Sequence, residues 1–591
     1  MVRSPRWSRA ALVAVTTIVV AACSSASPTA SPAASVAPPA TSAPATTAPA
    51  SAAPYAAMFY PATGEAPCAQ AAPPDATHAA YVGEFKKISA LDANTVEFQL
   101  CNPDVAFLSK IAFSAFGIDD ADYLAAHAAD KSILTEPNGT GPYKLQEWSK
   151  GNRIVMTAND AYWGAKAQTP GLEFRWSDEA AQRWLELQSG SVDGIDNPGT
   201  DDIATIKGDS SVAFYPREGL NTFYLGFNNT IKPWSNVKIR QAIAMGIDRQ
   251  RIVDNFYPEG SEVATHFTPC AIPFGCTGEE TWAFDPTAAK ALLAEGMAEE
   301  GLTSISTKLQ FRNAVRGYLP DPPQIATEIA QQLKTNLGID AKLDLQESGA
   351  FLDANAAGTL DGIFLLGWGA DYPDATNFLD YHFGSGSGKK FGAPFDDIVA
   401  ALNKGGQTAD NAVREAAYTE ANNLIKKHVP VAIIAHGGSG TVFKADVTGA
   451  HSSPLSNEVF SVMKAADRET LVWMQNAEPL SLYCADETDG ETLRACEQMK
   501  ESLYAYKVGG TDTEPALAEA CTPNAELTVW TCKLRQGVTF HDGAAFDAND
   551  VVASFAAQWD VENPLHVGRT GAFEYFPGLF GGFLNPPAPT E

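Results

Sequence analysis

Hydrophobic and polar residues follow two different spacings along the chain, and each spacing predicts its own kind of element. At 95–100 they alternate one by one, which is typical of a half-buried strand. At 411–428 hydrophobic residues recur every three or four positions, which predicts an amphipathic helix. Beyond Pro269 such helices alternate with short apolar strands as far as 435. This alternation predicts an α/β fold with a parallel or mixed sheet covered on both faces.

Residues 527–555 combine a strand, a turn and the start of a helix. Leu527 to Leu534 alternates in hydrophobicity, and His541-Asp542-Gly543 is typical of a turn. Asp547 stands where an N-cap is expected, before a helix with one apolar side. By itself this pattern predicts only a β-turn-α unit.

The net charge of the chain argues against some classes of binding partner. The chain has 591 residues, enough for two to four domains, with 41 basic and 70 acidic residues and a net charge of −29. Such an acidic chain would repel nucleic acid and anionic membrane surfaces, so we expect no nucleic-acid partner.

The first 57 residues predict export. Three arginines precede an apolar run at 10–20 that is short for a membrane span. Val20-Ala21-Ala22-Cys23 matches the bacterial lipobox, so we expect a lipoprotein signal peptide at 1–23 and acylation of Cys23. A plain secretory signal is the alternative. The uncharged Ala, Ser, Pro and Thr residues at 24–57 predict a tether.

Export would also explain the other eight cysteines, because an even number in an oxidising compartment predicts disulfides. Their short spacings favour local pairs. We expect Cys68–Cys101, Cys270–Cys276, Cys484–Cys496 and Cys521–Cys532. A metal site competes with this interpretation, but Cys-x-x-Cys is absent and the nine histidines do not cluster. We therefore expect neither a metal nor a cofactor.

Catalytic signatures do not stand out in the sequence. The segment 436–440 is similar to a hydrolase oxyanion loop, but no Gly-x-Ser-x-Gly nucleophile turn accompanies it. The segment 384–390 lacks the spacing of a phosphate-binding loop. We expect a binding protein that is not an enzyme, with a secreted hydrolase or a structural surface protein as alternatives.

Several sequence blocks together point to one family. They are 527–555, Asn138 to Leu145, Asn159 to Gly164, Gly190 to Asp193, Phe227-Asn228 with Val237 to Arg249, and Gly367 to Asp374. In number and spacing these blocks resemble the family 5 extracellular solute-binding proteins, the dipeptide and oligopeptide receptors of ABC importers.

The order of the blocks departs from the family pattern. In the family the block found here at 527–555 lies near the N-terminus, and the family's beginning, here near Thr470, follows its end at 447–463. We interpret this order as a circular permutation, with the old termini joined near 464–467 and the new break between about Asn585 and Gly83. A truncated tandem or a misassembled gene is the alternative.

The resemblance implies a two-lobed, periplasmic-binding-protein-like α/β fold with mixed sheets and an extra third domain. Its domains would be an extra domain at 81–137 plus 504–585, lobe one at 138–269 plus 442–503, and lobe two at 270–441. Two crossover strands would join the lobes, and the hinge would lie near Pro269 and Thr441.

The turn at 367–374 is the main candidate for ligand contact. It follows an apolar strand, and α/β sheets bind ligands at such strand ends. Trp368 would offer an apolar wall, and the resemblance implies that Asp371 pairs with the α-ammonium group of a peptide; a core residue and a turn cap are the alternatives. The resemblance also places the acidic loop 483–490 at the pocket. The predicted ligand contacts are Trp368, Asp371, Tyr372, Asn377, Tyr483 and Asp486.

The resemblance further implies a function. The chain would be an extracytoplasmic receptor, lipid-anchored at the cell membrane in the periplasm or on the cell surface. It would close its lobes on a small peptide and deliver the peptide to an ABC permease. A receptor of the same fold for a non-peptide solute, such as an oligosaccharide, a nickel chelate or an opine-like compound, is the alternative. We expect a monomer.

Overall fold

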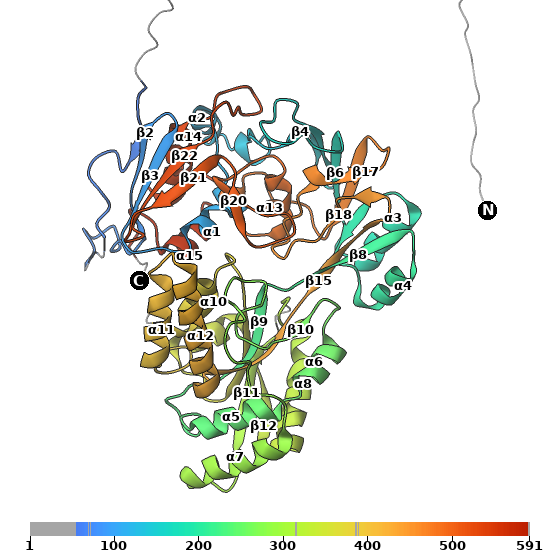
Figure 1. Cartoon of the computed structure of the whole chain (residues 1–591), viewed down its shortest axis with the longest axis vertical. Coiled ribbons are helices and arrows are strands. Elements are labelled where there is room, and N and C mark those ends of the chain that lie inside the picture. Colours follow the sequence, from blue (N-terminus) through green and yellow to red (C-terminus); the bar gives the residue numbers. More distant parts are fainter. Residues whose placement is uncertain are drawn as a thin grey trace, which may run out of the picture. The chain divides into compact units, whose positions relative to one another are not determined.

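The computed structural model describes residues 55–588 apart from 69, 71, 314–315, 385–386 and 388. The predicted signal peptide, Cys23 and most of the predicted tether lie outside the described residues. Three sheets organise the described chain, and each defines a part that we name the extra domain, lobe one and lobe two (Figure 1).

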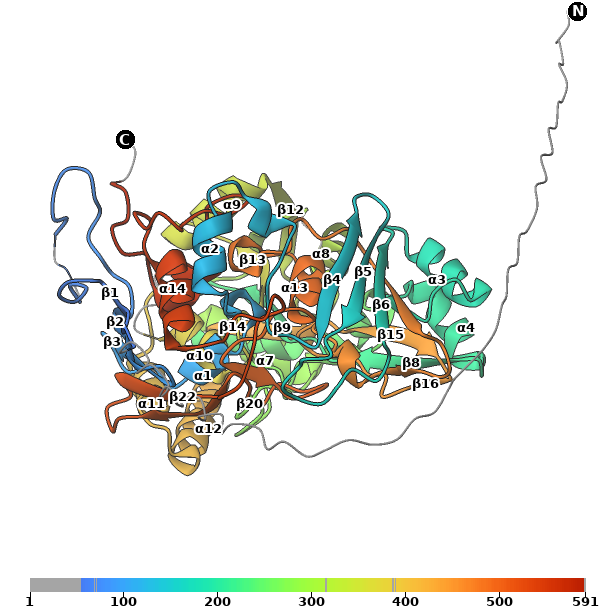
Figure 2. The ribbon, with the colours of Figure 1, turned by 90° about the horizontal axis from the view of Figure 1, so that it is seen from above.

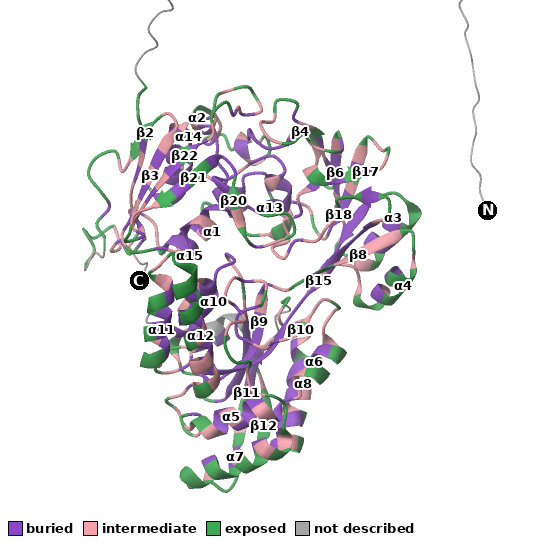
Figure 3. Cartoon of the chain, viewed as in Figure 1, coloured by how far each residue is buried: buried purple, intermediate pink, exposed green. Residues whose placement is uncertain are grey.

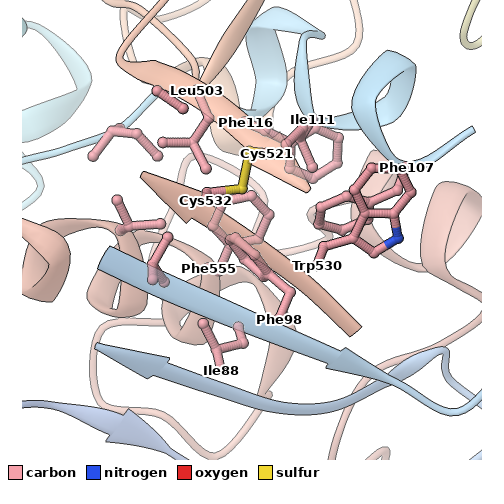
Figure 4. Close-up of a cluster of buried hydrophobic side chains, with 14 of the residues drawn as sticks. Ile88, Phe98, Phe107, Ile111, Phe116, Leu503, Cys521, Trp530, Cys532 and Phe555 are labelled. Atoms are coloured by element: carbon pink, nitrogen blue, oxygen red, sulfur yellow. A yellow bond between two sulfur atoms is a disulfide. The ribbon is translucent and has the colours of Figure 1, made fainter. Parts of the chain in front are cut away.

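The extra domain is an antiparallel five-stranded sheet covered by a helix. Its strand order is β1 (Phe59–Tyr60), β2 (Phe85–Asp92), β3 (Thr95–Leu100), β22 (Val529–Leu534) and β21 (Ala518–Pro523). Helix α14 (Ala548–Trp559) lies against this sheet, and Asp547 caps it by accepting from the N–H of Asn549. Figure 4 shows the core between them, where Phe98 of β3 packs on Phe555 of α14 with ring centroids 5.1 Å apart. The strand-turn-helix unit predicted at 527–555 is confirmed.

Smaller elements complete the extra domain and connect it to lobe one. They are α1 (Phe107–Ile111), α2 (Ala121–His127), β19 (Tyr504–Tyr506), β20 (Thr513–Pro515) and α15 (Tyr575–Phe580).

Lobe one contains a mixed seven-stranded sheet. Its strand order is β4 (Tyr143–Ser149), β5 (Arg153–Ala158), β6 (Gly171–Trp176), β18 (Thr470–Gln475), β7 (Gly194–Asp196), β15 (Ser439–Lys444) and β8 (Val212–Arg217). Strand β18 runs parallel to both of its neighbours, whereas the other pairs are antiparallel. The elements around this sheet are α3 (Ala180–Ser189), α4 (Ile203–Gly208), α13 (Gly490–Glu497) and the short pair β16 (Val447–Thr448) and β17 (Lys464–Ala465).

Lobe two contains a mixed six-stranded sheet flanked by helices. Its strand order is β10 (Glu262–Val263), β14 (Val431–His436), β9 (Asn221–Gly226), β13 (Ile363–Gly369), β11 (Ser306–Arg312) and β12 (Asp340–Gln346). Its helices are α5 (Val237–Gly246), α6 (Arg249–Phe256), α7 (Pro286–Glu299), α8 (Pro322–Gln332), α9 (Ser348–Ala357), α10 (Ala375–Phe383), α11 (Asp396–Gly406) and α12 (Asn411–His428). Every residue of β14 is buried, whereas the outer face of α7 is exposed (Figure 3). The mixed sheet is the one that the helix-strand alternation predicts.

The chain crosses between the lobes twice. It leaves lobe one between β8 and β9, at 218–220, and returns between β14 and β15, at 437–438. The second crossing lies close to the predicted Thr441. The first lies about fifty residues before the predicted Pro269, so β9, α5, α6 and β10 belong to lobe two and not to lobe one. Sequence periodicity predicts a strand near 223–228, but it does not predict which sheet that strand joins.

Segments from opposite ends of the sequence lie side by side in the extra domain (Figure 2). Strand β22 pairs with β3, with Trp530 opposite Phe98. The N–H of Ala79 donates to the carbonyl oxygen of Pro586 at 2.8 Å, and the N–H of Ala588 donates to that of Thr77 at 2.9 Å. The two ends of the described chain therefore meet in one domain.

Element boundaries agree with the sequence prediction where the local signal is strong. The helix predicted at 411–428 is α12. Residues 237–256 form two helices and not one, because the chain becomes extended at Ile247 and Asp248 caps α6 by accepting from the N–H of Arg251. An aspartate inside a helical pattern competes with the helix for backbone donors and starts a new one.

All four predicted disulfides are present. They are Cys68–Cys101, Cys270–Cys276, Cys484–Cys496 and Cys521–Cys532. Cys521–Cys532 joins directly opposed residues of β21 and β22, and the bond is visible in Figure 4. Among the described residues, no helix has both the length and the apolar character needed to cross a membrane.

Candidate functional site

A cavity of about 1180 Å³ lies where the two crossings pass between the lobes. This volume is above the range of about 300–1,000 Å³ that is usual for small-molecule sites. The cavity is lined by Trp368, Asp371, Tyr381 and Lys390 of lobe two, by Arg217 and Ser439 of lobe one, and by Phe113 and Tyr575 of the extra domain, among others. All three parts of the chain therefore contribute to one site.

The two crossings form one wall of this cavity and are tightly packed. Asn221 Nδ2 donates to the carbonyl oxygen of Gly437 at 2.7 Å, and the N–H of Gly437 donates to Asn221 Oδ1 at 2.8 Å. A Cβ atom on Gly219 would overlap the carbonyl oxygen of Gly437, and one on Gly437 would overlap that of Gly317. Glycine is needed at these two positions because backbone passes backbone without room for a side chain.

Asp371 and Trp368 are held by one buried amide, that of Asn377. Strand β13 ends at Gly369, and Asp374 caps α10 by accepting from the N–H of Thr376 at 3.0 Å. Asn377, in the first turn of α10, donates from Nδ2 to Asp371 Oδ2 at 3.0 Å. Its Oδ1 accepts from Trp368 Nε1 at 3.2 Å and from the N–H of Asp371 at 3.0 Å. The turn therefore presents a carboxylate and an indole to the cavity in a fixed arrangement.

The carboxylate of Asp371 is half-buried and lacks a cation. Burial raises the pKa of Asp371 above its usual value, and the hydrogen bond from Asn377 opposes this effect. No lysine, arginine or histidine of the described chain forms an ion pair with it. A partly desolvated carboxylate is stabilised by a positive charge at hydrogen-bonding distance. The site is therefore suited to an ammonium group supplied by a ligand.

A buried ring of four charges lies beneath the cavity on the lobe-one side. Arg217 Nη2 contacts Asp196 Oδ1 at 2.9 Å and Glu458 Oε1 at 2.5 Å. Arg494 Nη2 contacts Asp196 Oδ2 at 2.9 Å, and its Nε contacts Glu458 Oε2 at 2.8 Å. Burial alone would raise the pKa of Glu458, but the two guanidinium groups outweigh it and lower the pKa to about 2.

This ring also fixes the second crossing, because Arg217 Nη1 donates to Ser439 Oγ at 3.1 Å. Sequence reasoning missed the ring. Its members are far apart in the chain, and one sequence contains no signal that pairs them.

Two of the six predicted ligand contacts line the cavity, namely Trp368 and Asp371. Asn377 is buried behind them and acts on the site by holding both. Tyr372 follows Asp371 in the same turn but points into the core of the extra domain, where Lys110 Nζ lies 5.4 Å from its ring centroid. Tyr381 also lines the cavity and stacks on Trp368 with ring centroids 4.1 Å apart.

The other two predicted contacts lie outside the cavity lining. Tyr483 is fully buried, and Lys500 Nζ lies 4.9 Å from its ring centroid. Asp486 accepts from the N–H groups of Thr570, Gly571 and Phe573 at 2.6–2.8 Å, so its charge organises a loop of the extra domain. Their loop still reaches the site, because its residues Thr488 and Gly490 line the cavity.

The histidines near the cavity are held by backbone groups. His436 Nδ1 pairs with the carbonyl oxygen of Asn221 at 2.6 Å, and burial lowers the pKa of His436 to about 4. His382 Nδ1 pairs with the carbonyl oxygen of Phe378 at 2.6 Å, and burial lowers its pKa to about 3. Among the described residues, no group of three potential metal ligands occurs.

Comparison with known proteins identifies the family of the chain. The sequence profile described as "Bacterial extracellular solute-binding proteins, family 5 Middle" matches residues 44–390 and 512–572. The dipeptide-binding protein of Escherichia coli K12 is 30% identical over 389 residues, which cover 64% of this chain and 71% of that protein. The dipeptide-binding protein of Pseudomonas aeruginosa is 28% identical over 387 residues, covering 63% and 70%.

A solved structure, that of HbpA2 from Haemophilus parasuis, aligns with a TM-score of 0.59 at 29% identity and covers 63% of this chain and 74% of that one. The profile match spans more than half of the sequence. The chain therefore belongs to the bacterial extracellular solute-binding proteins of family 5.

Proposed function

We propose that this protein is a peptide receptor that captures a small peptide in the cavity between its lobes. The half-buried carboxylate of Asp371 carries the proposal, because it faces the cavity beside an aromatic wall and lacks a cation among the described residues. The α-ammonium group of a peptide supplies that cation, and Trp368 and Tyr381 cover the adjoining apolar part. The names of the relatives support a peptide ligand.

We further propose that binding works by lobe closure. The proposed ligand contacts Trp368, Asp371 and Tyr381 lie on lobe two, whereas the opposite wall belongs to lobe one and the extra domain. A ligand that touches both walls favours the closed form by its difference in affinity for the two forms, and a permease can recognise that form. Delivery to an ABC permease and anchoring through acylated Cys23 belong to this proposal. The lipobox motif supports the anchor.

The order of the family's blocks leads us to propose that the chain is a circular permutant. The pairing of 77–79 with 586–588 supports this, because a permutant needs its new ends side by side. The insertion of β18 between β6 and β7 supports it as well, since a strand from late in the sequence occupies the centre of the lobe-one sheet.

Thermal unfolding in the presence of candidate ligands tests the proposed function. Because a ligand that binds only the folded state raises the unfolding midpoint, di- to pentapeptides should raise it with increasing concentration. The Asp371→Ala variant should lose this shift. A shift with oligosaccharides or metal chelates alone, unchanged in Asp371→Ala, would replace the peptide with another solute. No shift with any of these compounds would contradict the receptor function.

A further inference from the structure

Lys390 directs an ammonium group at the cavity without an acidic partner. It lines the cavity and is half-buried, and its Nζ lies 3.6 Å from the ring centroid of Tyr381. Within the part of the chain that the structure describes, this ring is its contact, and no carboxylate acts on its charge. Burial lowers the pKa of Lys390 to about 8, so the group is still largely charged at neutral pH.

Buried cations elsewhere in the described chain are held by oxygen atoms. Lys110 Nζ contacts Asp104 at 2.9 Å and Glu84 at 3.2 Å. Arg240, which has no carboxylate, instead donates to backbone carbonyl oxygens such as that of Val429 at 2.9 Å. A desolvated cation is costly unless such groups compensate it. Among the described residues, Lys390 therefore differs from these cations because it lacks an oxygen partner. This cation lies at the wall of the cavity.

The aromatic wall separates this cation from the acid of the site. Trp368 stacks on one face of the Tyr381 ring at 4.1 Å, so the ammonium group of Lys390 occupies the other face. Asp371 is joined to Trp368 through Asn377. The wall thus carries a negative group at its Trp368 end and a positive group beyond Tyr381. This pattern is complementary to a ligand with an ammonium group and a carboxylate on either side of an apolar part.

We propose that Lys390 is a specificity-determining residue that pairs with a carboxylate of the bound peptide. This inference rests on the proposed peptide function. It adds that the charge of Lys390 selects peptides with a carboxylate at that position. The carboxylate is either the C-terminus of the peptide or an acidic side chain. The pair forms in a partly desolvated cavity, where charge-assisted hydrogen bonds are stronger than on the surface.

Titration calorimetry with three tripeptides separates these sources. The probes are Ala-Glu-Ala, Ala-Gln-Ala and the C-terminal amide of Ala-Gln-Ala. The first two differ in side-chain charge, and the last two differ in the terminal carboxylate. We expect the wild-type protein to prefer the carboxylate in one of these pairs by at least tenfold, or about 1.4 kcal/mol. Lys390→Met should bring that ratio close to one, and Lys390→Arg should largely restore it.

A matched control variant, and the affinity ratios of the two peptide pairs within each variant, separate a loss of specificity from a loss of stability. Lys389→Met removes the adjacent exposed charge, which does not line the cavity, and should leave both ratios unchanged. Because each ratio is measured within one variant, a general loss of stability cancels. Unchanged ratios in Lys390→Met, with a lower unfolding midpoint, would show that the lysine only packs on Tyr381 and would overturn the inference. A wild-type protein that binds none of the three probes would contradict the proposed peptide function itself.

Discussion

The side-chain amide of Asn221 forms two reciprocal hydrogen bonds with the backbone of Gly437, at 2.7 and 2.8 Å. Asn221 begins β9, just after the first crossing between the lobes, and Gly437 lies in the second crossing. One amide therefore fixes the spacing of the two segments on which any movement of the lobes must act. The same segments line the cavity, so the two crossings and the proposed site share residues.

Asn221→Ala should lower stability and change ligand affinity together. Losing the two bonds leaves partly buried backbone groups of Gly437 unpaired, which costs about 1–3 kcal/mol. Asn524→Ala is the matched control, because Asn524 Oδ1 accepts from the N–H groups of Thr528 and Val529 in a turn of the extra domain. Both variants should unfold at lower denaturant concentration. Peptide affinity, measured at denaturant concentrations at which both variants are still folded, should change only in Asn221→Ala. An Asn221→Ala affinity equal to that of the wild type would contradict the role of this amide.

Asn377→Leu should weaken peptide binding about tenfold, the equivalent of one charge-assisted hydrogen bond. The buried amide touches Asp371 and Trp368 but does not line the cavity, so it is a positioning residue. Its hydrogen bond lowers the pKa of Asp371, so the variant should lose affinity at a higher pH than the wild type as the solution is acidified.

Asn422→Leu is the control for that variant. Asn422 is equally buried in lobe two and donates to the carbonyl oxygen of Thr277 at 2.8 Å, away from the cavity. This variant should be less stable but should keep the wild-type dependence of affinity on pH. If both variants show the same dependence, Asn377 does not act through Asp371.

Tyr372→Ala should favour the open form. The ring of Tyr372 leaves the turn at 367–374 and packs in the core of the extra domain. Thr511 Oγ1 adds a hydrogen bond between the extra domain and lobe two, to the carbonyl oxygen of Ala271 at 2.6 Å. Removing a buried aromatic ring costs about 3–5 kcal/mol. Small-angle X-ray scattering should show a larger radius of gyration for the ligand-free variant. Tyr372→Phe, which keeps the ring, should scatter like the wild type. An unchanged radius of gyration in Tyr372→Ala would contradict the role of Tyr372 in holding lobe two against the extra domain.

The contribution of Asp380 to stability should fall as the pH rises from 4 to 8. Burial, with a contribution from the charge of Asp374, raises the pKa of Asp380 to about 8, against the opposing charge of Arg414. Above pH 4 the unfolded chain loses this proton while the folded chain keeps it until about pH 8, so rising pH favours unfolding. The slope for one such group is at most about 1.4 kcal/mol per pH unit.

Asp380→Asn should therefore be more stabilising at pH 8 than at pH 5, as measured by urea unfolding at both values. Asp380 Oδ2 has no hydrogen-bond partner among the described residues, so the amide loses little. Asp374→Asn is the contrasting variant, because both oxygens of Asp374 accept from Arg414 at 2.8 Å. It should be destabilising at both pH values. An Asp380→Asn effect that does not change with pH would contradict a raised pKa.

Local patterns in the sequence predict the elements and part of the site. The spacing at 411–428 specifies a helix, and the turn at 367–374 lies at the end of β13 with Trp368 and Asp371 at the cavity. The close cysteine spacings were also sufficient to predict the disulfides. In each case the determining interactions lie within a few dozen residues of one another.

Contacts between distant segments could not be predicted in this way. Tyr372 and Asp371 are neighbours in one polar turn, and only the position of the extra domain decides that Tyr372 points away from the cavity. The sequence around Asp486 gives no sign of a partner, but its first hydrogen-bond donor, the N–H of Thr570, lies 84 positions later. The first crossing between the lobes could not be located for the same reason, since the sheet that β9 joins depends on strands from 363 onward.

Titration calorimetry of one peptide pair tests the central proposal most directly. Ala-Ala and N-acetyl-Ala-Ala differ in the α-ammonium group that Asp371 is proposed to bind. The wild-type protein should bind Ala-Ala at least tenfold more tightly than its acetylated form. Asp371→Asn should bind the two peptides equally, so that Ala-Ala loses about 1.4 kcal/mol or more of binding free energy. Wild-type protein that binds both peptides with the same affinity, or Asp371→Asn that keeps the preference, would contradict recognition of the peptide through Asp371.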